Sequence, residues 1–225
     1  VLRSLQKQMA EASARQDFEQ AAMLRDRIRL IENLDKRGSV REHVQPEVFM
    51  PDPAEALIKL QHILQSPQPV RIIEGFDIAH LAGTEMVGSM VQFIDGHPFK
   101  DGYRRFKIKT VSGVDDYAAL KEIVSRRYKR AMAGEELWPD LILIDGGIGQ
   151  LHAAEEALIE INASMPNLAS LAKKEEVIYL RGRSAPLKLP ANSPVRKLLQ
   201  YIRDEAHRFA QHYHHILRRK SVLEQ

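Results

Sequence analysis

Apolar residues in the first 34 positions recur at the three- and four-residue spacing of amphipathic helices. One series runs from Leu2 to Ala12 and a second from Phe18 to Ile31. This pattern predicts an α-helical hairpin over residues 1–34. Two short helices cannot bury such stripes within the pair alone, so the hairpin requires a second apolar surface, either the rest of the chain or a partner.

The next segment has the composition of a linker followed by a short helix. Residues 35–53 contain Gly38, Ser39 and three prolines and are poor in periodic apolar positions. Helical spacing returns from Ala54 to Leu64, and Pro67 ends it. The sequence therefore predicts a linker and lead-in helix over residues 35–69.

Short apolar runs replace the helical spacing from residue 70 onward. Three such runs occupy Val70–Ile78, Met86–Ile94 and Tyr103–Thr110, and Asp-Gly dipeptides at 95–96 and 101–102 separate them. Asp-Gly is a frequent turn sequence between antiparallel strands. These runs predict an antiparallel meander.

Helices and strands alternate in the remainder of the chain. The predicted elements are a helix over 115–133, a strand over 141–144, a helix over 150–161, a strand near 168–172, a hairpin over 177–189 and a final helix from Ser193-Pro194 to about Arg219. The run at 141–144 is continuously apolar, which is typical of a strand buried on both faces. The element order predicts an α/β fold, a ribonuclease H-like mixed sheet with flanking helices over residues 70–221.

Composition narrows the class of protein. The chain has no cysteine, which excludes disulfides and thiolate metal sites and fits a cytoplasmic location. No window approaches the roughly 18 consecutive apolar residues of a membrane span, so no membrane partner is expected. Between Tyr103 and Arg130, nine Lys or Arg residues stand against three acidic ones. Such a surplus is either a phosphate-binding surface, with Arg104, Arg105 and Lys107 at its head, or a solvated face.

Several aspartates lie within an apolar strand, at the end of a buried strand or at the start of a helix, where the carboxylate is expected to have a specific role. Asp77 lies inside an apolar strand, which is costly unless the charge is paired with a cation or binds metal. Asp145 ends the buried strand at the edge where ligands gather in open sheets, but an Asp before Gly also forms turns. Asp115 and Asp116 precede a helix, where capping is the simpler explanation.

Together these acids predict a site for a hard cation. Oxygen ligands without thiolates suit Mg²⁺ or Mn²⁺, and such an ion can activate water and stabilise charge on a phosphate. With a basic surface nearby, a phosphodiester is the natural substrate. On the last helix, the wheel centred on Leu198, Ile202 and Phe209 puts His207 on the solvent side and Glu205 near the edge of the apolar stripe.

Several strings in the chain resemble one known family. IEGFDIAH (73–80), YRRFKIKT (103–110), DDYAAL (115–120), SRRYKR (125–130), PDLILIDGGIGQL (139–151) and RDEAHRFA (203–210) are similar to the C-terminal endonuclease half of the UvrC family. DFEQAAMLRDRI (17–28) resembles the UVR motif, a hairpin that contacts the helicase UvrB. The resemblance implies a metal-dependent endonuclease of nucleotide excision repair that cuts damaged double-stranded DNA on the 5′ side of a lesion.

The resemblance also implies roles for individual residues. The catalytic set comprises Asp77, Asp116, Asp145 and His207, with Asp77 and Asp145 as ligands of Mg²⁺ or Mn²⁺. Further phosphate contacts are Lys173, Arg181 and Arg183, from a segment similar to one in the family. Contacts to a UvrB-like partner are expected from Phe18, Ala22, Arg25, Asp26 and Ile28 in the hairpin.

Two other functions remain open at the level of sequence. The chain could be a non-catalytic adaptor that binds UvrB and DNA, or a ribonuclease H-like nuclease of another pathway. The family's N-terminal GIY-YIG nuclease and its helix-hairpin-helix module are absent from these 225 residues. The sequence is accordingly expected to be either a fragment or a short homologue.

Overall fold

The computed structural model describes residues 52–80, 86–111, 115–173 and 175–223, with scattered positions between residues 8 and 28. The chain forms two compact units. One comprises Val1–Val48 with Lys129–Leu137, and the other comprises Phe49–Tyr128 with Trp138–Gln225.

The first unit contains the predicted hairpin. Of the residues expected to contact a partner, Arg25 is helical and exposed, and Ile28 is helical and buried. Phe18, Ala22 and Asp26 lie outside the described residues. The helical state of the described positions agrees with the predicted helices, and the hairpin itself stays a prediction.

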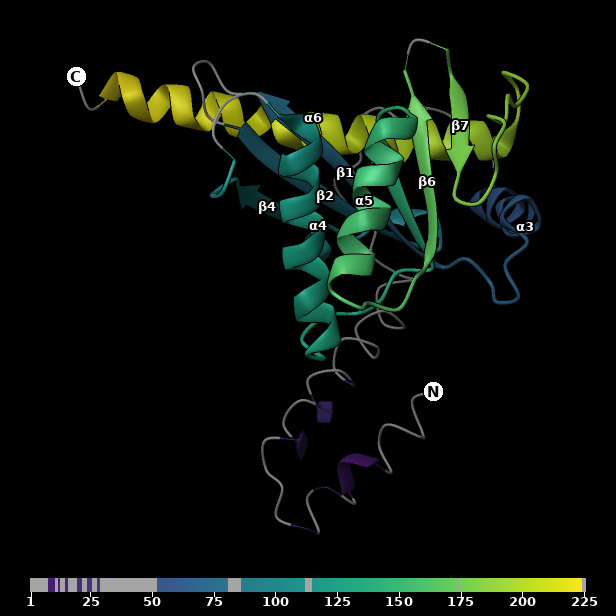
Figure 1. Cartoon of the computed structure of the whole chain (residues 1–225), viewed down its shortest axis with the longest axis horizontal. Helices are drawn as coiled ribbons and strands as arrows, with labels where there is room; N and C mark the ends of the chain where they lie inside the picture. The colour runs from purple at the N-terminus through teal and green to yellow at the C-terminus, as the bar shows by residue number, and fades with distance from the viewer. Residues whose placement is uncertain are drawn as a thin grey trace. The chain divides into compact units, whose positions relative to one another are not determined.

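The second unit contains the sheet and its helices, except for the last four residues of α4, which belong to the first unit (Figure 1). In chain order the elements are α3 (Pro53–Leu64), β1 (Ile72–His80), β2 (Met86–Ile94), β3 (His97–Pro98), the 3-10 turn η2 (Lys100–Gly102), β4 (Arg104–Lys107), α4 (Asp116–Met132), β5 (Leu141–Asp145), α5 (Ile148–Glu160), β6 (Asn167–Ala172), β7 (Val177–Leu180) and α6 (Pro194–Leu223). Among the described residues, no helix is both long enough and apolar enough to cross a membrane.

Within the described residues, seven strands form one mixed sheet in the order β3-β2-β1-β5-β6-β7, and β4 also pairs with β2. The strands β1, β2 and β4 are antiparallel neighbours, as the meander predicted. The strands β1, β5 and β6 run parallel, and β7 returns antiparallel to β6. The carboxyl ends of β1 and β5 therefore lie at the same edge of the sheet.

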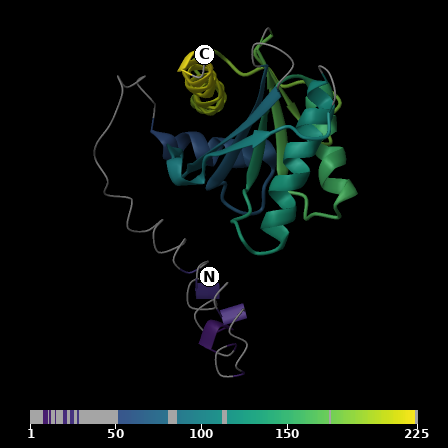
Figure 2. The same cartoon turned by 90° about the vertical axis from the view of Figure 1, so that its left-hand side faces the viewer.

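Helices cover both faces of this sheet. The long helix α6 crosses one face, and α4 and α5 lie on the other, as the two views show (Figures 1 and 2). Helix α3 packs against α6. The hydrophobic core formed by these two helices and the sheet includes Leu60, Ile73, Leu143 and Ile202. Because strands β2 and β5 are covered on both faces, nearly every residue in them is buried.

A buried polar network lies on the α4 side of β1. The fully buried Glu74 carboxylate accepts hydrogen bonds from Arg127 Nη2 at 2.5 Å, Tyr128 Oη at 2.7 Å and Gln92 Nε2 at 3.0 Å. Burial raises the pKa of Glu74, and the charge and hydrogen bond of Arg127 oppose that rise. The network connects β1, β2 and α4 through one carboxylate.

Most element boundaries agree with the sequence pattern, and the differences have local causes. The Asp95-Gly96 turn has positive φ at both residues, 49° and 79°, as a tight hairpin turn requires. The predicted third strand shortens to Arg104–Lys107. The predicted hairpin over 177–189 is reduced to β7 and a single bridge between Ile178 and Leu187, on the edge of β7 that does not pair with β6.

Candidate active site

Parallel pairing of β1 with β5 sets the position of the two central aspartates. The paired register of β1 and β5 ends at Phe76 opposite Ile144, so Asp77 and Asp145 follow at the next position on the two strands. Residues at matched positions on neighbouring strands point to the same face of a sheet. Both carboxylates therefore face the side that α6 covers.

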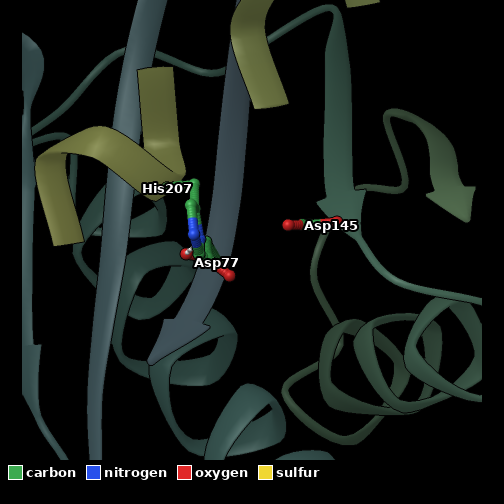
Figure 3. A group of neighbouring side chains, drawn as sticks. All are labelled: Asp77, Asp145 and His207. Carbon is green, nitrogen blue, oxygen red and sulfur yellow. Dashed lines mark hydrogen bonds and ion pairs between the residues drawn. The ribbon is translucent and has the colours of Figure 1, made fainter. Parts of the chain in front are cut away.

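Asp77, Asp145 and His207 form one group of potential metal ligands. Each offers a ligand atom, and these atoms all lie within 4.8 Å of one another. Figure 3 shows the Asp145 carboxyl pointing toward Asp77, with the His207 ring coming from α6. His207 Nδ1 lies 3.1 Å from Asp77 Oδ2, within hydrogen-bond distance.

The position of His207 depends on how closely α6 approaches the sheet. Ser89 on β2, the register partner of Asp77, donates from Oγ to the Ala206 carbonyl at 3.0 Å. Ala206 and Ala210 are buried, and such small side chains allow a helix backbone to lie near the strands. His207 follows Ala206 and reaches the rim of this contact, with 43% of its side chain exposed.

The helical wheel was wrong about the surroundings of His207. It took the large side chains, Phe209 among them, as the centre of the buried stripe and placed His207 on the solvent side. In the structure Phe209 is only half-buried, and the buried face runs through Ala206 and Ala210. This rotation brings His207 to Asp77. The wheel's expectation for Glu205 is confirmed, since it is buried and accepts a hydrogen bond from Tyr103 Oη at 2.9 Å.

The electrostatics of the group favour an added positive charge. Burial and then the Asp145 charge raise the pKa of Asp77 to about 6, while His207 opposes the rise. Burial also raises the pKa of Asp145, against the charges of Arg203, His207 and Lys173. Two carboxylates that are both harder to ionise than usual gain most from a cation placed between them.

The structure separates the roles of Asp115 and Asp116. The Asp115 carboxylate accepts from the backbone N–H groups of Tyr117 and Ala118, both at 3.0 Å, so Asp115 caps α4. Asp116 is the first residue of α4, which packs on the opposite face of the sheet from α6. Among the described residues, it is not part of the group of ligand atoms within 4.8 Å. Its catalytic role stays a prediction.

The basic residues of β4 lie beside the site. Arg105 is the register partner of Ser89, which is in turn the partner of Asp77, so the three follow one another across neighbouring strands. The Arg105 guanidinium lies 4.1 Å from the centroid of the Phe209 ring on α6. Arg104 and Lys107 lie at either side on the same strand. This places a cationic edge two strands from Asp77.

The other predicted phosphate contacts divide between the two ends of the sheet. Lys173 directly follows β6, and its charge acts on Asp145. Arg181 and Arg183 follow β7 at the opposite end, where Arg181 pairs with Glu155 at 2.6 Å and Arg183 donates to the Ile63 carbonyl at 3.0 Å. The structure does not bring Arg181 and Arg183 to the aspartates.

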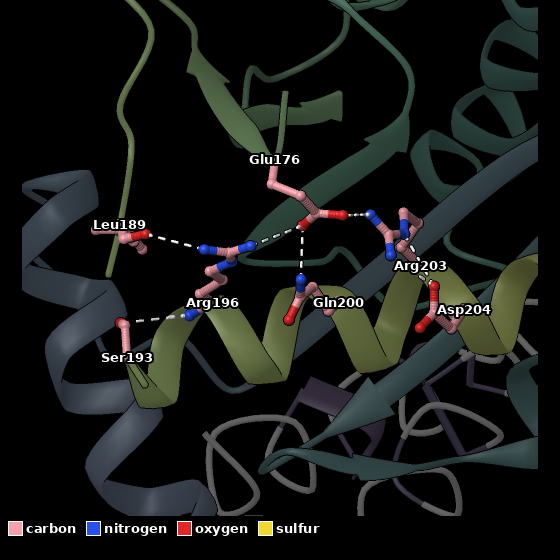
Figure 4. A network of polar contacts seen from close by, with 7 residues as sticks. All are labelled: Glu176, Leu189, Ser193, Arg196, Gln200, Arg203 and Asp204. Carbon is pink, nitrogen blue, oxygen red and sulfur yellow. Dashed lines mark hydrogen bonds and ion pairs between the residues drawn. The ribbon is translucent and has the colours of Figure 1, made fainter. Parts of the chain in front are cut away.

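Sequence reasoning missed Arg203 and Glu176. Arg203 lies one helical turn before His207, is 7% exposed and pairs with Glu176 at 3.0 Å (Figure 4). A signal was available, because Arg203 and His207 are four residues apart and must share one helix face. Glu176 offered none, since its partners are distant in the chain.

Two family models match the chain. Residues 61–211 match a family model described as the UvrC RNAse H endonuclease domain, and residues 1–34 match the UvrB/uvrC motif. The first match and the mixed sheet with helices on both faces confirm the predicted ribonuclease H-like fold class.

Curated relatives carry one name. UvrABC system protein C of Koribacter versatilis is 51% identical over 69% of this chain and 26% of its own length. UvrABC system protein C of Methanosarcina acetivorans is 48% identical over 74% of this chain and 32% of its own length. The chain thus spans about a quarter to a third of the relatives that it matches.

Solved structures with a similar chain path include human ENDOV, at 13% identity and a TM-score of 0.38. That match covers 71% of this chain and 90% of the other. The catalytic domain of human Endonuclease V has 15% identity and a TM-score of 0.37, over 85% of this chain and 95% of the other.

Proposed function

The chain belongs to the UvrC family, and from this premise we propose that it is a divalent-metal-dependent DNA endonuclease of nucleotide excision repair. It cuts on the 5′ side of a lesion in double-stranded DNA while bound to a UvrB-like helicase. The observation that carries the proposal is the convergence of Asp77, Asp145 and His207 at one edge of the sheet. Residues 70–221 form the nuclease domain, and residues 1–34 form the hairpin that binds the partner.

Asp77 and Asp145 are the proposed ligands of a Mg²⁺ or Mn²⁺ ion. The donor set fits such an ion because it offers carboxylate oxygens and an imidazole nitrogen, whereas the chain contains no thiolate. The raised pKa values of both carboxyls also fit, since burial makes their charges costly and a bound cation would offset that cost. When bound, the ion supplies an acidified water and offsets negative charge on the phosphodiester.

His207 is proposed to handle a proton next to Asp77. Its Nδ1 lies 3.1 Å from Asp77 Oδ2, and its Nε2 lies 2.9 Å from Gln211 Nε2, so both ring nitrogens are held. An imidazole in that position can take or return a proton during cleavage and can orient the Asp77 carboxylate. Asp116 is proposed to help place the ion or the attacking water from the other side of the sheet edge.

The DNA backbone is proposed to lie along β4 and across the site. Arg104, Arg105 and Lys107 bind phosphates on one side of the aspartates, and Lys173 binds a phosphate on the other. Arg181 and Arg183 form a separate contact at the far end of the sheet. Because phosphate contacts release counterions, DNA affinity should fall steeply as salt is raised.

Cleavage of a nicked, lesion-bearing duplex in the presence of a UvrB homologue tests the proposal. We expect incision 5′ to the lesion in Mn²⁺ and none when a chelator replaces the metal. If the protein binds the duplex and UvrB but cuts nothing in Mn²⁺ or Mg²⁺, the chain is an adaptor. Cutting of an RNA–DNA hybrid in preference to the lesion-bearing duplex contradicts the assignment to excision repair.

Stability without metal should fall as pH rises. The folded-state pKa of Asp77, about 6, is above its usual value of 3.8, so the folded protein holds the proton more tightly. That contribution is complete below pH 4 and is lost as pH rises through 6, a loss of about 1–3 kcal/mol. Mn²⁺ should therefore raise the unfolding midpoint more at pH 8 than at pH 5. Calorimetry in Mn²⁺ and in chelator checks this, and an equal shift at both pH values contradicts it.

The hairpin's contribution to partner binding can be measured separately. We expect Phe18→Ala to weaken the affinity for a UvrB homologue by about tenfold or more, because buried aromatic side chains dominate the energy of protein interfaces. Surface plasmon resonance measures the change, and Glu19→Ala serves as a neighbouring control with near-normal affinity. Unchanged binding by Phe18→Ala, with helix content intact by circular dichroism, contradicts the assignment of residues 1–34.

A further inference from the structure

Arg203 is a buried cation near the proposed metal ligands that has no role in the function described above. It lies on α6 one turn before His207, and 7% of its side chain is exposed. Among the charges that oppose the raised pKa of Asp145, Arg203 has the largest effect. Helix α6 thus presents two groups at the site, with His207 beside Asp77 and Arg203 acting on the charge of Asp145.

Carboxylates other than Asp145 hold the Arg203 guanidinium. Its Nη1 donates to Glu176 Oε1 at 3.0 Å, and its Nε and Nη2 lie 2.9 and 2.8 Å from Asp204 Oδ1. Two carboxylates therefore fix the guanidinium. Among the described residues, the ion pairs of Arg203 within 4.0 Å are with Glu176 and Asp204, and none is with Asp145.

Glu176 contacts three side chains along α6 (Figure 4). Besides Arg203, it accepts a hydrogen bond from Gln200 Nε2 at 2.6 Å, and Arg196 Nη2 lies 3.7 Å from its Oε2. These partners occupy successive turns of one helix face. Glu176 itself has a positive φ of 51°, a conformation that a non-glycine residue keeps only when its surroundings hold it.

The same turn carries Lys173. Lys173 follows β6 directly and Glu176 precedes β7 directly, so both belong to the β6–β7 turn. The Lys173 side chain is exposed, and its charge acts on Asp145. The contacts of Glu176 with α6 therefore hold the turn from which the exposed Lys173 side chain extends.

We propose that Glu176 is a positioning residue of the nuclease site, because it attaches the β6–β7 turn to α6 and so sets where Lys173 meets a DNA phosphate beside Asp145. This inference rests on the proposed nuclease function. Glu176 does not touch the substrate. It acts through Lys173, and Arg203 is the side chain that connects it to the helix bearing His207.

The physical reason is the charge balance of the site. A phosphodiester brings a further negative charge to two carboxylates, and cleavage increases the charge on its oxygens. A cation fixed in advance at the right place lowers the barrier without reorganisation, whereas a cation displaced by about 1 Å loses much of that effect. Loosening the turn should therefore lower kcat more than it raises KM, because the contacts along β4 continue to hold the DNA.

Glu176→Gln, Lys173→Gln and the double variant test the inference on the full chain with its partner. We expect Glu176→Gln to lower kcat about tenfold with less than a twofold change in KM. The double variant should cut no more slowly than Lys173→Gln alone, since both substitutions remove the same contribution, that of a correctly placed Lys173. Additive losses, or a normal kcat for Glu176→Gln, overturn the proposal.

A matched control separates positioning from general stability. Glu160, the last residue of α5, carries another surface carboxylate, which pairs with Lys121 at 2.7 Å. Glu160→Gln removes this carboxylate and should leave kcat unchanged. Hydrogen exchange at the β6–β7 turn should quicken in Glu176→Gln but not in Glu160→Gln. If the wild type cuts nothing, the nuclease proposal fails. Hydrogen exchange then tests the attachment of the β6–β7 turn by Glu176 separately, because unchanged exchange at the turn in Glu176→Gln overturns that attachment.

Discussion

Replacing Asp77 with Asn should lower the rate of DNA cleavage by roughly three orders of magnitude or more, because it removes a proposed metal ligand whose function no neighbour can supply. The substitution keeps the size and shape of the side chain, so the fold should persist. Single-turnover cleavage of the nicked duplex in Mn²⁺ measures the rate. Calorimetric titration should show weaker Mn²⁺ binding by the same variant.

The same substitution should stabilise the metal-free protein at pH 8. Asp77 is 6% exposed and its pKa is raised, so its charge costs free energy when no cation is present. Asp95→Asn is the matched control, since Asp95 pairs with Arg71 at 2.7 Å in the turn before β3 and should leave both rate and metal binding unchanged. An Asp77→Asn protein that cuts at the normal rate would falsify the metal-site assignment.

Removing the buried carboxylate of Glu74 should have the largest effect on stability, about 3–5 kcal/mol for Glu74→Leu. The substitution leaves Arg127, which is 1% exposed, without the carboxylate that it meets at 2.5 Å. Arg127 keeps its charge at both pH values, whereas the raised pKa of Glu74 gives the wild type stability at low pH that the variant lacks, so the loss should be at least as large at pH 5 as at pH 8. Urea unfolding followed by circular dichroism measures it, and Glu74→Gln is the control that keeps the size and shape of the side chain.

The opposite substitution should behave differently. In Arg127→Met the buried Glu74 remains, and because burial already raises its pKa it can take up a proton and lose its charge. The destabilisation should therefore be smaller at pH 5 than at pH 8. The double variant should recover most of the loss, because it buries no charge at all. A pH-independent loss in Arg127→Met contradicts this account.

Much of the fold follows from the periodicity of the sequence alone. The helix and strand positions after residue 53 agree with their predictions to within a few residues, because each element alternates or repeats its apolar positions in a regular way. The Asp95-Gly96 turn was also predictable from the sequence, since its backbone requires residues that tolerate positive φ. Strand pairing in the last part of the sheet was harder to predict. The segment after Gly182 forms only one bridge to β7, on the edge opposite β6.

The candidate site was predictable only in part. A carboxylate in an apolar strand and another at the end of a buried strand marked Asp77 and Asp145, since the cost of such burial demands an explanation. The choice of His207 came from the family resemblance, against the helical wheel. The wheel failed because it weighs side chains by size, whereas the buried face of α6 runs through Ala206 and Ala210.

By itself, the sequence determined which elements form and which residues carry unusual charge, because these depend on neighbours a few positions apart. Only the tertiary structure decided what those residues meet. The parallel register of β1 with β5 brings Asp77 beside Asp145, and the approach of α6 brings His207 to them. The attachment of Glu176 to α6 likewise joins segments more than twenty residues apart. Such contacts depend on how elements pack in three dimensions, which no spacing along the chain encodes.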